Sequence, residues 1–213
     1  MGVAAAKATD AARSGAAHGD AFSHSEGGEL EIAVVLKPGI GMKDVPGVPY
    51  VVALGACEGL DSLGVSGVGI GWPADLTSER GLVSSVRTAA GYEDGIFVVA
   101  SLAFNLSDAN EGMPSEQQLA SGVCKGILAR VDDWAANAAA GRTAAGFLAP
   151  VLSDYFDRVL LMGKPVDVVY PNGRVAMKGT LAGIDIWGRA TIKNELGGEL
   201  EISPEQASIR ASR

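Results

Sequence analysis

A glycine-rich segment that ends in an acidic turn carries the residues whose types could do chemistry. It reads Gly69-Ile70-Gly71-Trp72-Pro73-Ala74-Asp75-Leu76. The Trp72-Pro73 pair could form the floor of a ligand pocket, and the Asp75 carboxylate could position a Mg²⁺ ion or a water. A packed turn beside the core is the simpler interpretation of Trp72 and Pro73. Asp75 fits equally well as a turn residue or a helix cap.

Further candidate ligand contacts lie around and after this segment. Arg80 follows the turn and would supply a positive charge, and Asn105 closes an apolar run at 96–106. A hydrogen bond at the end of a strand is the simpler role for Asn105. The glycines within 64–71 offer backbone amides that could cradle a phosphate, although close packing explains them more simply.

The cysteines and histidines give little support to a metal or redox site. Cys57 and Cys124 lie in apolar helical patterns, which is typical of small buried side chains. His18 and His24 lie in a polar stretch without cysteines or clustered carboxylates nearby, so we expect surface positions for both. Asp75 is therefore the candidate metal ligand.

The composition argues against several classes of function. The 213 residues include 17 Lys and Arg against 25 Asp and Glu, which gives a formal net charge of −8. Because the basic residues are scattered, we expect no nucleic-acid partner. Hydrophobic residues make up 47%, enough for a core, but no apolar run approaches the ~20 residues of a membrane span. Residues 1–12 lack the apolar stretch of a signal peptide, which predicts a cytoplasmic protein.

Apolar periodicity predicts the elements that must position these residues. In chain order they are a strand at 29–36, a helix at 49–63, short strands at 65–70 and 80–90, a buried strand at 96–106, and helices at 115–140 and 144–161. The helix at 115–140 has the strongest signal, because Ser115 and Gln118 form a capping box in front of a regular apolar face.

These elements predict an α+β fold in three parts. Residues 1–28 are expected to form a flexible arm without packed structure. Residues 29–161 would form a mixed β-sheet with helices packed against one side. Residues 162–213 contain short strands and an Asn172-Gly173 hairpin turn, which predicts a small SH3-like β-barrel.

The order of these motifs resembles the biotin–protein ligase family over most of the chain. The turn at 69–76 is similar to the family's K-W-P-N-D-L signature. Residues 26–38 resemble its P-x-G-G-L-Y…S-x-x-L-R-P strand, and residues 98–105 resemble its G-x-G-I-N-V-N strand, with Asn105 at the first Asn. Residues 163–166, 183–188 and 208–210 resemble its C-terminal domain, so the fold expected is that of the biotin/lipoate ligase catalytic core.

The resemblance implies an activity that uses biotin, ATP and Mg²⁺. The family joins biotin to AMP and then transfers biotin to a lysine of a carrier protein. Two anions must meet in the first step, so the family site supplies a lysine and a G-R-G-R-x-G-R loop. Here Gly71 stands at the lysine position and Ala74 at the asparagine position, while residues 13–22 stand where the loop belongs. A preceding strand–helix–strand with biotin-contacting Ser, Thr and Gln residues is also expected to be missing.

We therefore expect a degenerate relative that is not catalytic by itself, and no catalytic residue is assigned. The ligand-binding candidates are Trp72, Pro73, Asp75, Arg80 and Asn105. One alternative is an active ligase completed by a partner chain that pairs with an exposed edge strand at 30–36. Another is a binder or ligase for a related acid such as lipoate. Expected partners are a biotin-carrier protein, a complementing ligase chain, or a second copy in a homodimer.

Overall fold

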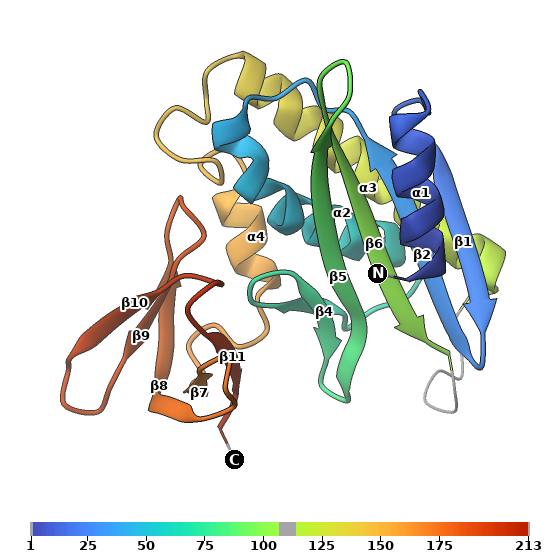
Figure 1. Ribbon diagram of the computed structural model, residues 1–213. Helices are drawn as coiled ribbons and strands as arrows, with labels where there is room; N and C mark the ends of the chain where they lie inside the picture. Colours follow the sequence, from blue (N-terminus) through green and yellow to red (C-terminus); the bar gives the residue numbers. More distant parts are fainter. Residues whose placement is uncertain (1, 107–113, 213) are drawn as a thin grey trace.

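The computed structural model describes residues 2–106 and 114–212, which form two sheets and four α-helices (Figure 1). The larger sheet has the strand order β1-β2-β6-β5-β4-β3. Its strands are β1 (Ala21–Glu26), β2 (Glu29–Leu36), β6 (Ile96–Asn105), β5 (Gly81–Tyr92), β4 (Asp75–Ser78) and β3 (Gly69–Gly71). This architecture confirms the predicted α+β class.

The pairing of the larger sheet differs from the prediction in two ways. We expected a mixed sheet, but its strands pair antiparallel, because short turns join most neighbours and a parallel pair needs a long crossover. A bridge between Ile70 and Val159 is parallel but isolated. The strand predicted at 29–36 is not an edge. It is β2, which pairs with β1 on one side and β6 on the other, so β1 is the edge strand.

Two long helices cover one face of the larger sheet. They are α2 (Val48–Ser62), which follows a 3-10 turn at Met42–Gly47, and α3 (Glu116–Ala139), and both confirm predicted helices. The predicted capping box is present. The Ser115 hydroxyl accepts from the Gln118 amide, and Gln118 Oε1 accepts from the Ser115 amide at 3.1 Å. In the described part of the chain, no helix is both long enough and apolar enough to cross a bilayer.

Glycines bring α2 and α3 into backbone contact. Gly55 and Gly59 on α2 face Gly122 and Gly126 on α3, and each pair is spaced by four residues. A Cβ atom at Gly59 would lie 2.5 Å from the Gly122 carbonyl oxygen, and one at Gly126 would lie 2.6 Å from the Gly59 amide nitrogen. At Gly55, Gly59 and Gly126, a larger residue would therefore push the two helices apart.

The N-terminal segment lies on the opposite face of the sheet. Helix α1 (Val3–Arg13) lies in front of the sheet in Figure 1, and α2 and α3 lie behind it. Its contact face consists of small residues, namely Ala4, Ala5, Ala8 and Ala12. They pack on the β2 and β6 side chains Ala33, Val35, Phe97 and Val99. The prediction of a flexible arm at 1–28 was wrong. Alanines at helical spacing form an apolar face here, and this face contains none of the large hydrophobic residues by which such a helix is usually recognised.

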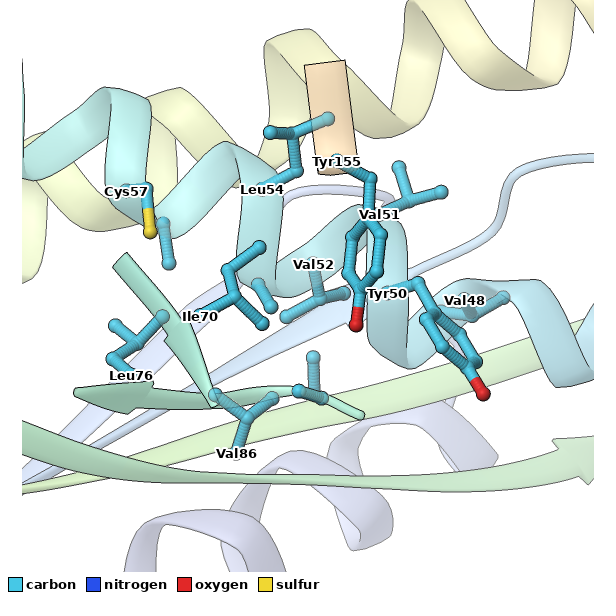
Figure 2. Close-up of a cluster of buried hydrophobic side chains, with 14 of the residues drawn as sticks. Val48, Tyr50, Val51, Val52, Leu54, Cys57, Ile70, Leu76, Val86 and Tyr155 are labelled. Atoms are coloured by element: carbon cyan, nitrogen blue, oxygen red, sulfur yellow. The ribbon is translucent and has the colours of Figure 1, made fainter. Parts of the chain in front are cut away.

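The main core fills the space between the sheet and α2 and α3. Figure 2 shows Ile70, Leu76 and Val86 of the strands beneath α2, with Tyr50 and Tyr155 close together at one end. The two tyrosine rings pack edge to face, with centroids 5.3 Å apart. This arrangement anchors helix α4 (Leu152–Arg158), which carries Tyr155, to the start of α2.

Helix α4 is much shorter than the helix predicted at 144–161. Turns occupy the residues before Leu152. The Leu148 amide donates to the Ile186 carbonyl of the C-terminal part instead of to a helical neighbour. Pro150 has no amide hydrogen to donate. Both features prevent a regular helix from starting earlier.

The C-terminal part forms a five-stranded antiparallel sheet in the order β10-β9-β8-β7-β11. Its strands are β7 (Pro165–Val169), β8 (Val175–Ile184), β9 (Ala190–Lys193), β10 (Glu199–Ile202) and β11 (Ser208–Ala211). The predicted Asn172-Gly173 turn joins β7 to β8. The predicted barrel is not closed, because β10 and β11 have four residues each and lie at opposite edges of this sheet.

Candidate functional site

A groove of about 390 Å³ lies between α1 and the larger sheet, and we call it the α1 groove. Helix α1 supplies one wall, and β2, β5 and β6 supply the floor. Its polar lining includes Thr9, Glu29, Glu31, Ser85, Arg87 and Ser101. This face of the sheet bears both acidic and basic side chains, whereas the other face packs on the main core and is open only beside β1, where a groove of about 910 Å³ lies between β1, β2 and α3.

The strand register explains why the floor of the α1 groove is open. Glu31 of β2, Ala103 of β6 and Ser85 of β5 form one row across the sheet. Ser101 and Arg87 belong to the next row. Alternate residues of a strand point to the same face, so these side chains all face α1. Because most of them are small, they leave space under the helix.

Glu31 ties this floor to the start of α1. Its side chain is 9% exposed, and its two carboxylate oxygens accept the amides of Ala4 at 2.8 Å and Ala5 at 3.1 Å. Gly2, at the N-cap position, has no side chain to accept these amides, and a Cβ atom there would overlap the Glu31 carboxylate. Glu31 therefore acts as the helix cap, and its negative charge meets the positive end of the helix dipole.

Arg87 is the basic residue of the α1 groove, and it pairs with a residue of the predicted site. Its Nη1 donates to Asp75 Oδ1 at 3.0 Å, and the same oxygen accepts the Val86 amide at 3.1 Å. Nη1 also donates to the Val86 carbonyl at 2.8 Å. Asp75 thus stabilises the junction of β4 and β5 and neutralises the cation at the groove rim. The pair is exposed to solvent, so it adds at most about 1 kcal/mol of stability.

Trp72 and Pro73 lie away from the α1 groove, at the contact with the C-terminal sheet. Trp72 is 5% exposed, and its indole Nε1 donates to the Gly188 carbonyl at 2.9 Å. The Tyr50 hydroxyl donates to the same carbonyl at 2.9 Å. The Pro73 carbonyl accepts the Tyr155 hydroxyl at 2.7 Å. The Trp72 and Tyr50 donors thus hold the C-terminal part of the chain against the larger sheet and its helices, and the Tyr155 hydroxyl holds Pro73 against α4.

Arg80, Asn105 and Gly71 occupy three separate places. Arg80 is exposed in the turn between β4 and β5, where its amide donates to Ser78 Oγ. Asn105 is exposed at the end of β6, opposite Glu29 and one row beyond the Glu31 row of the groove floor. Gly71 ends β3, and a Cβ atom there would lie 2.9 Å from Thr77 Cγ2. The structure therefore brings Asp75 and Asn105 toward the groove face and places the other candidates elsewhere.

The segment expected in place of an arginine-rich loop has a fixed structure. Residues 13–22 form the end of α1, a turn and the start of β1. His18 Nδ1 accepts the Lys37 amide at 2.8 Å, which ties this turn to the end of β2. The tight turn at Gly27 and Gly28 then joins β1 directly to β2. Neither connection presents a row of arginines to the α1 groove.

The charged side chains around the α1 groove are acidic or paired. Glu29 and Glu31 place negative charge in its lining, and Arg87 is paired with Asp75. Within residues 2–106 and 114–212, no three His, Cys, Asp or Glu side chains gather to hold a metal ion. The Asp75 carboxylate faces the Arg87 cation and not a second carboxylate.

The cysteines lie in the core, as predicted, and they are free thiols. Burial raises the pKa of the Cys57 thiol to about 12 and that of the Cys124 thiol to about 11. Both thiols therefore stay protonated at neutral pH, which keeps them unreactive.

Sequence reasoning did not identify Glu31, Arg87 or the start of α1 as parts of a site. A signal for Glu31 was present, because it is a charged residue between Leu30 and Ile32 in an otherwise apolar strand. Arg87 carried no such signal, since an arginine in a half-exposed strand is ordinary. Glu31, Arg87 and the start of α1 lie close together because β2, β6 and β5 pair side by side, and the sequence pattern does not specify that pairing.

The architecture has clear counterparts among solved structures. Biotin protein ligase from Aquifex aeolicus in complex with biotin and ATP matches with a TM-score of 0.70 and 17% identity, over 96% of this chain and 94% of that one. A mutant of that ligase in complex with biotin matches with a TM-score of 0.66 and 16% identity, over 92% and 91%. A biotin protein ligase-like protein of unknown function from Silicibacter sp. TM1040 matches with a TM-score of 0.67 and 18% identity, over 92% and 88%.

Comparisons of sequence give no further relatives. No protein-family model matches the chain, and no curated protein matches it. At 16–18% identity the structural matches establish architecture and not activity. The resemblance carried by the sequence motifs is therefore confirmed at the level of the fold: this chain has the fold of the biotin protein ligases.

Proposed function

We propose that this chain is a biotin protein ligase-like binding protein that does not form an acyl-adenylate by itself. The observation that carries the proposal is the pairing of Arg87 with Asp75 in a groove that also contains Glu29 and Glu31. Joining a carboxylate to the α-phosphate of ATP brings two anions together, which requires free cationic groups. A groove with this charge balance disfavours that step.

The environment of Gly71 supports the same proposal. The resemblance implies a lysine at this position, but a Cβ atom would meet the Thr77 side chain at 2.9 Å. Restoring the lysine would therefore require Thr77 to move. Loss of one preorganised electrostatic contact of this kind costs about 3–4 kcal/mol of transition-state stabilisation.

Activity and binding have to be measured separately. The full chain is incubated with biotin, ATP and Mg²⁺, and biotinyl-AMP is quantified by mass spectrometry, with lipoate run in parallel. We expect no adenylate from either acid. Accumulation of biotinyl-AMP or lipoyl-AMP above an enzyme-free control would refute the proposal that the chain is inactive alone.

Calorimetric titration with non-hydrolysable biotinyl- and lipoyl-adenylate analogues tests the binding part. Saturable binding of one analogue without turnover supports a binding protein and identifies the acid. Asp75→Asn is the matched variant, because it releases Arg87 from its carboxylate partner. We expect it to bind the analogue more tightly than the wild-type chain. If neither chain binds either analogue, the proposed ligand class is wrong.

An active ligase completed by a second chain is the other candidate, and the edge position of β1 favours it. Among the described strands β1 pairs with β2 alone, so its outer side can accept a strand from a partner. The test is to purify the chain with any tightly associated protein and repeat the adenylate assay. Adenylate that forms only in the presence of the second chain would support this candidate.

A further inference from the structure

Helix α1 is attached to the sheet more weakly than the other long helices. The buried residues of its contact face are alanines, and these pack with four buried sheet residues in a cluster that is separate from the main core, with Phe22 of β1 partly buried against it. Alanine buries little apolar area, and hydrophobic stabilisation grows in proportion to the apolar area that is buried. By contrast, α2 and α3 contribute large side chains such as Leu60 and Trp134 to the main core.

The connection between α1 and β1 contains a natural pivot. Gly15 has a φ of +93° and would have nothing within 4 Å of a Cβ atom, and the Ala16 amide donates across it to the Ala11 carbonyl at 2.9 Å. The chain is fixed again a few residues later. The Gly19 amide donates to the Val35 carbonyl at 2.8 Å, and the Val35 amide donates to the Asp20 carbonyl at 2.9 Å. A rotation about the turn at Ser14 and Gly15 would break the hydrogen bond from Ala16 to Ala11, move α1 and leave β1 in place.

At the far end of α1, the polar attachment to the floor is the Glu31 carboxylate. It accepts the amides of Ala4 and Ala5, and no side chain within α1 caps those amides. Hydrogen bonds to a buried charged group are among the stronger polar contacts in proteins. The pivot, the alanine face and the Glu31 attachment lie in sequence along one helix.

We propose that α1 is a movable wall of the α1 groove and that Glu31 is the latch that holds it closed. When the carboxylate releases the two amides, α1 swings about Gly15 and the groove floor at Ser101 and Ala103 becomes accessible. The latch goes beyond the proposed function, since it operates whether or not the groove holds an acyl-adenylate.

Native-state hydrogen exchange tests the latch without any ligand. In the wild-type chain, we expect the amides of residues 6–12 to exchange by a local opening, faster than the amides at the centre of α3. Glu31→Ala should accelerate exchange in α1 on the order of 10- to 100-fold and leave α3 unchanged. Glu31→Gln keeps one acceptor oxygen and should have a smaller effect. Glu29→Gln, which alters an exposed carboxylate on the same strand, is the matched control and should change neither helix.

A second measurement covers the case in which Glu31→Ala does not fold. The substitution Ser101→Cys places a thiol on the groove floor, and the two native cysteines are buried. Labelling of the introduced thiol by a bulky reagent should accelerate in the Glu31→Gln background and not in the Glu29→Gln background. The proposal is overturned if α1 in the wild-type chain exchanges only with the global unfolding of α3. It is equally overturned if Glu31→Gln leaves both α1 exchange and the labelling of the introduced thiol at their wild-type rates.

Discussion

Replacing Gly126 with alanine should destabilise the protein even though alanine favours helices. The perturbation adds one methyl group to α3 at its closest approach to α2. That Cβ atom would lie 2.6 Å from the Gly59 amide nitrogen and 2.8 Å from the Gly59 Cα, and it would overlap the Gly55 carbonyl oxygen. All three obstructing atoms belong to the α2 backbone, so no side-chain rotation can relieve the contact.

The magnitude follows from two opposing effects. Alanine gains about 1 kcal/mol over glycine in helix propensity. Overpacking of a core costs about 1–3 kcal/mol, and a rigid backbone obstacle places this site at the upper end. The net expectation is a loss of about 2 kcal/mol in the free energy of unfolding, which for a chain of this size lowers Tm by roughly 4–8 °C.

Gly122→Ala is the matched control on the same helix. The three atoms nearest to its Cβ atom all belong to the side chain of Leu63, at 2.7–3.0 Å, and Leu63 is half-buried and able to rotate. We expect a change within about 0.5 kcal/mol, because the propensity gain offsets the adjustment. Urea denaturation followed by circular dichroism measures both variants. Equal stability of Gly126→Ala and Gly122→Ala would refute the argument that the α2–α3 contact is limited by backbone atoms.

Two further predictions concern the contact between the sheets and the buried thiols. Trp72→Phe and Tyr50→Phe each remove one donor from the Gly188 carbonyl, and each should lower the free energy of unfolding by about 1 kcal/mol. The double variant should lower it by more than the sum, because the carbonyl then loses both partners. Additive losses in urea denaturation would contradict a shared acceptor. The raised pKa values of Cys57 and Cys124 mean that the folded state keeps its thiol protons more tightly than the unfolded state. The contribution of the thiols to the free energy of unfolding should therefore be fully present below pH 9 and fall as the pH rises from about 9 toward 12. At pH 8, a thiol reagent should label neither cysteine until denaturant is added. Rapid labelling of the native chain would show that the thiols are not buried.

Elements with large side chains at regular spacing could be predicted from the sequence. The helix at 115–140 and the strand at 29–36 were found because their apolar residues follow helical and alternating periods. Helix α1 was missed because its apolar face contains alanine alone. The C-terminal strands were predicted, but closure of a barrel depends on whether the edge strands reach one another, which local pattern does not specify.

The candidate site was predictable only in part, for a related reason. Asp75 and Asn105 could be singled out because they follow recognisable motifs. Their surroundings come from strands that are distant in sequence, and the register of β2, β6 and β5 decides that Glu31 and Arg87 share one face. The burial of Trp72 against Gly188 also depends on contact between distant parts of the chain.

The separate alanine cluster beneath α1 also bears on the order in which the chain can fold during synthesis. Helix α1 is synthesised well before two of its packing partners, Phe97 and Val99, which lie in β6 roughly 85 residues later. At about 5–20 residues per second, the helix must wait roughly 5–20 s for that strand. An alanine-rich helix with little exposed apolar surface is well suited to this delay, because it offers few sites for premature association before the sheet is complete.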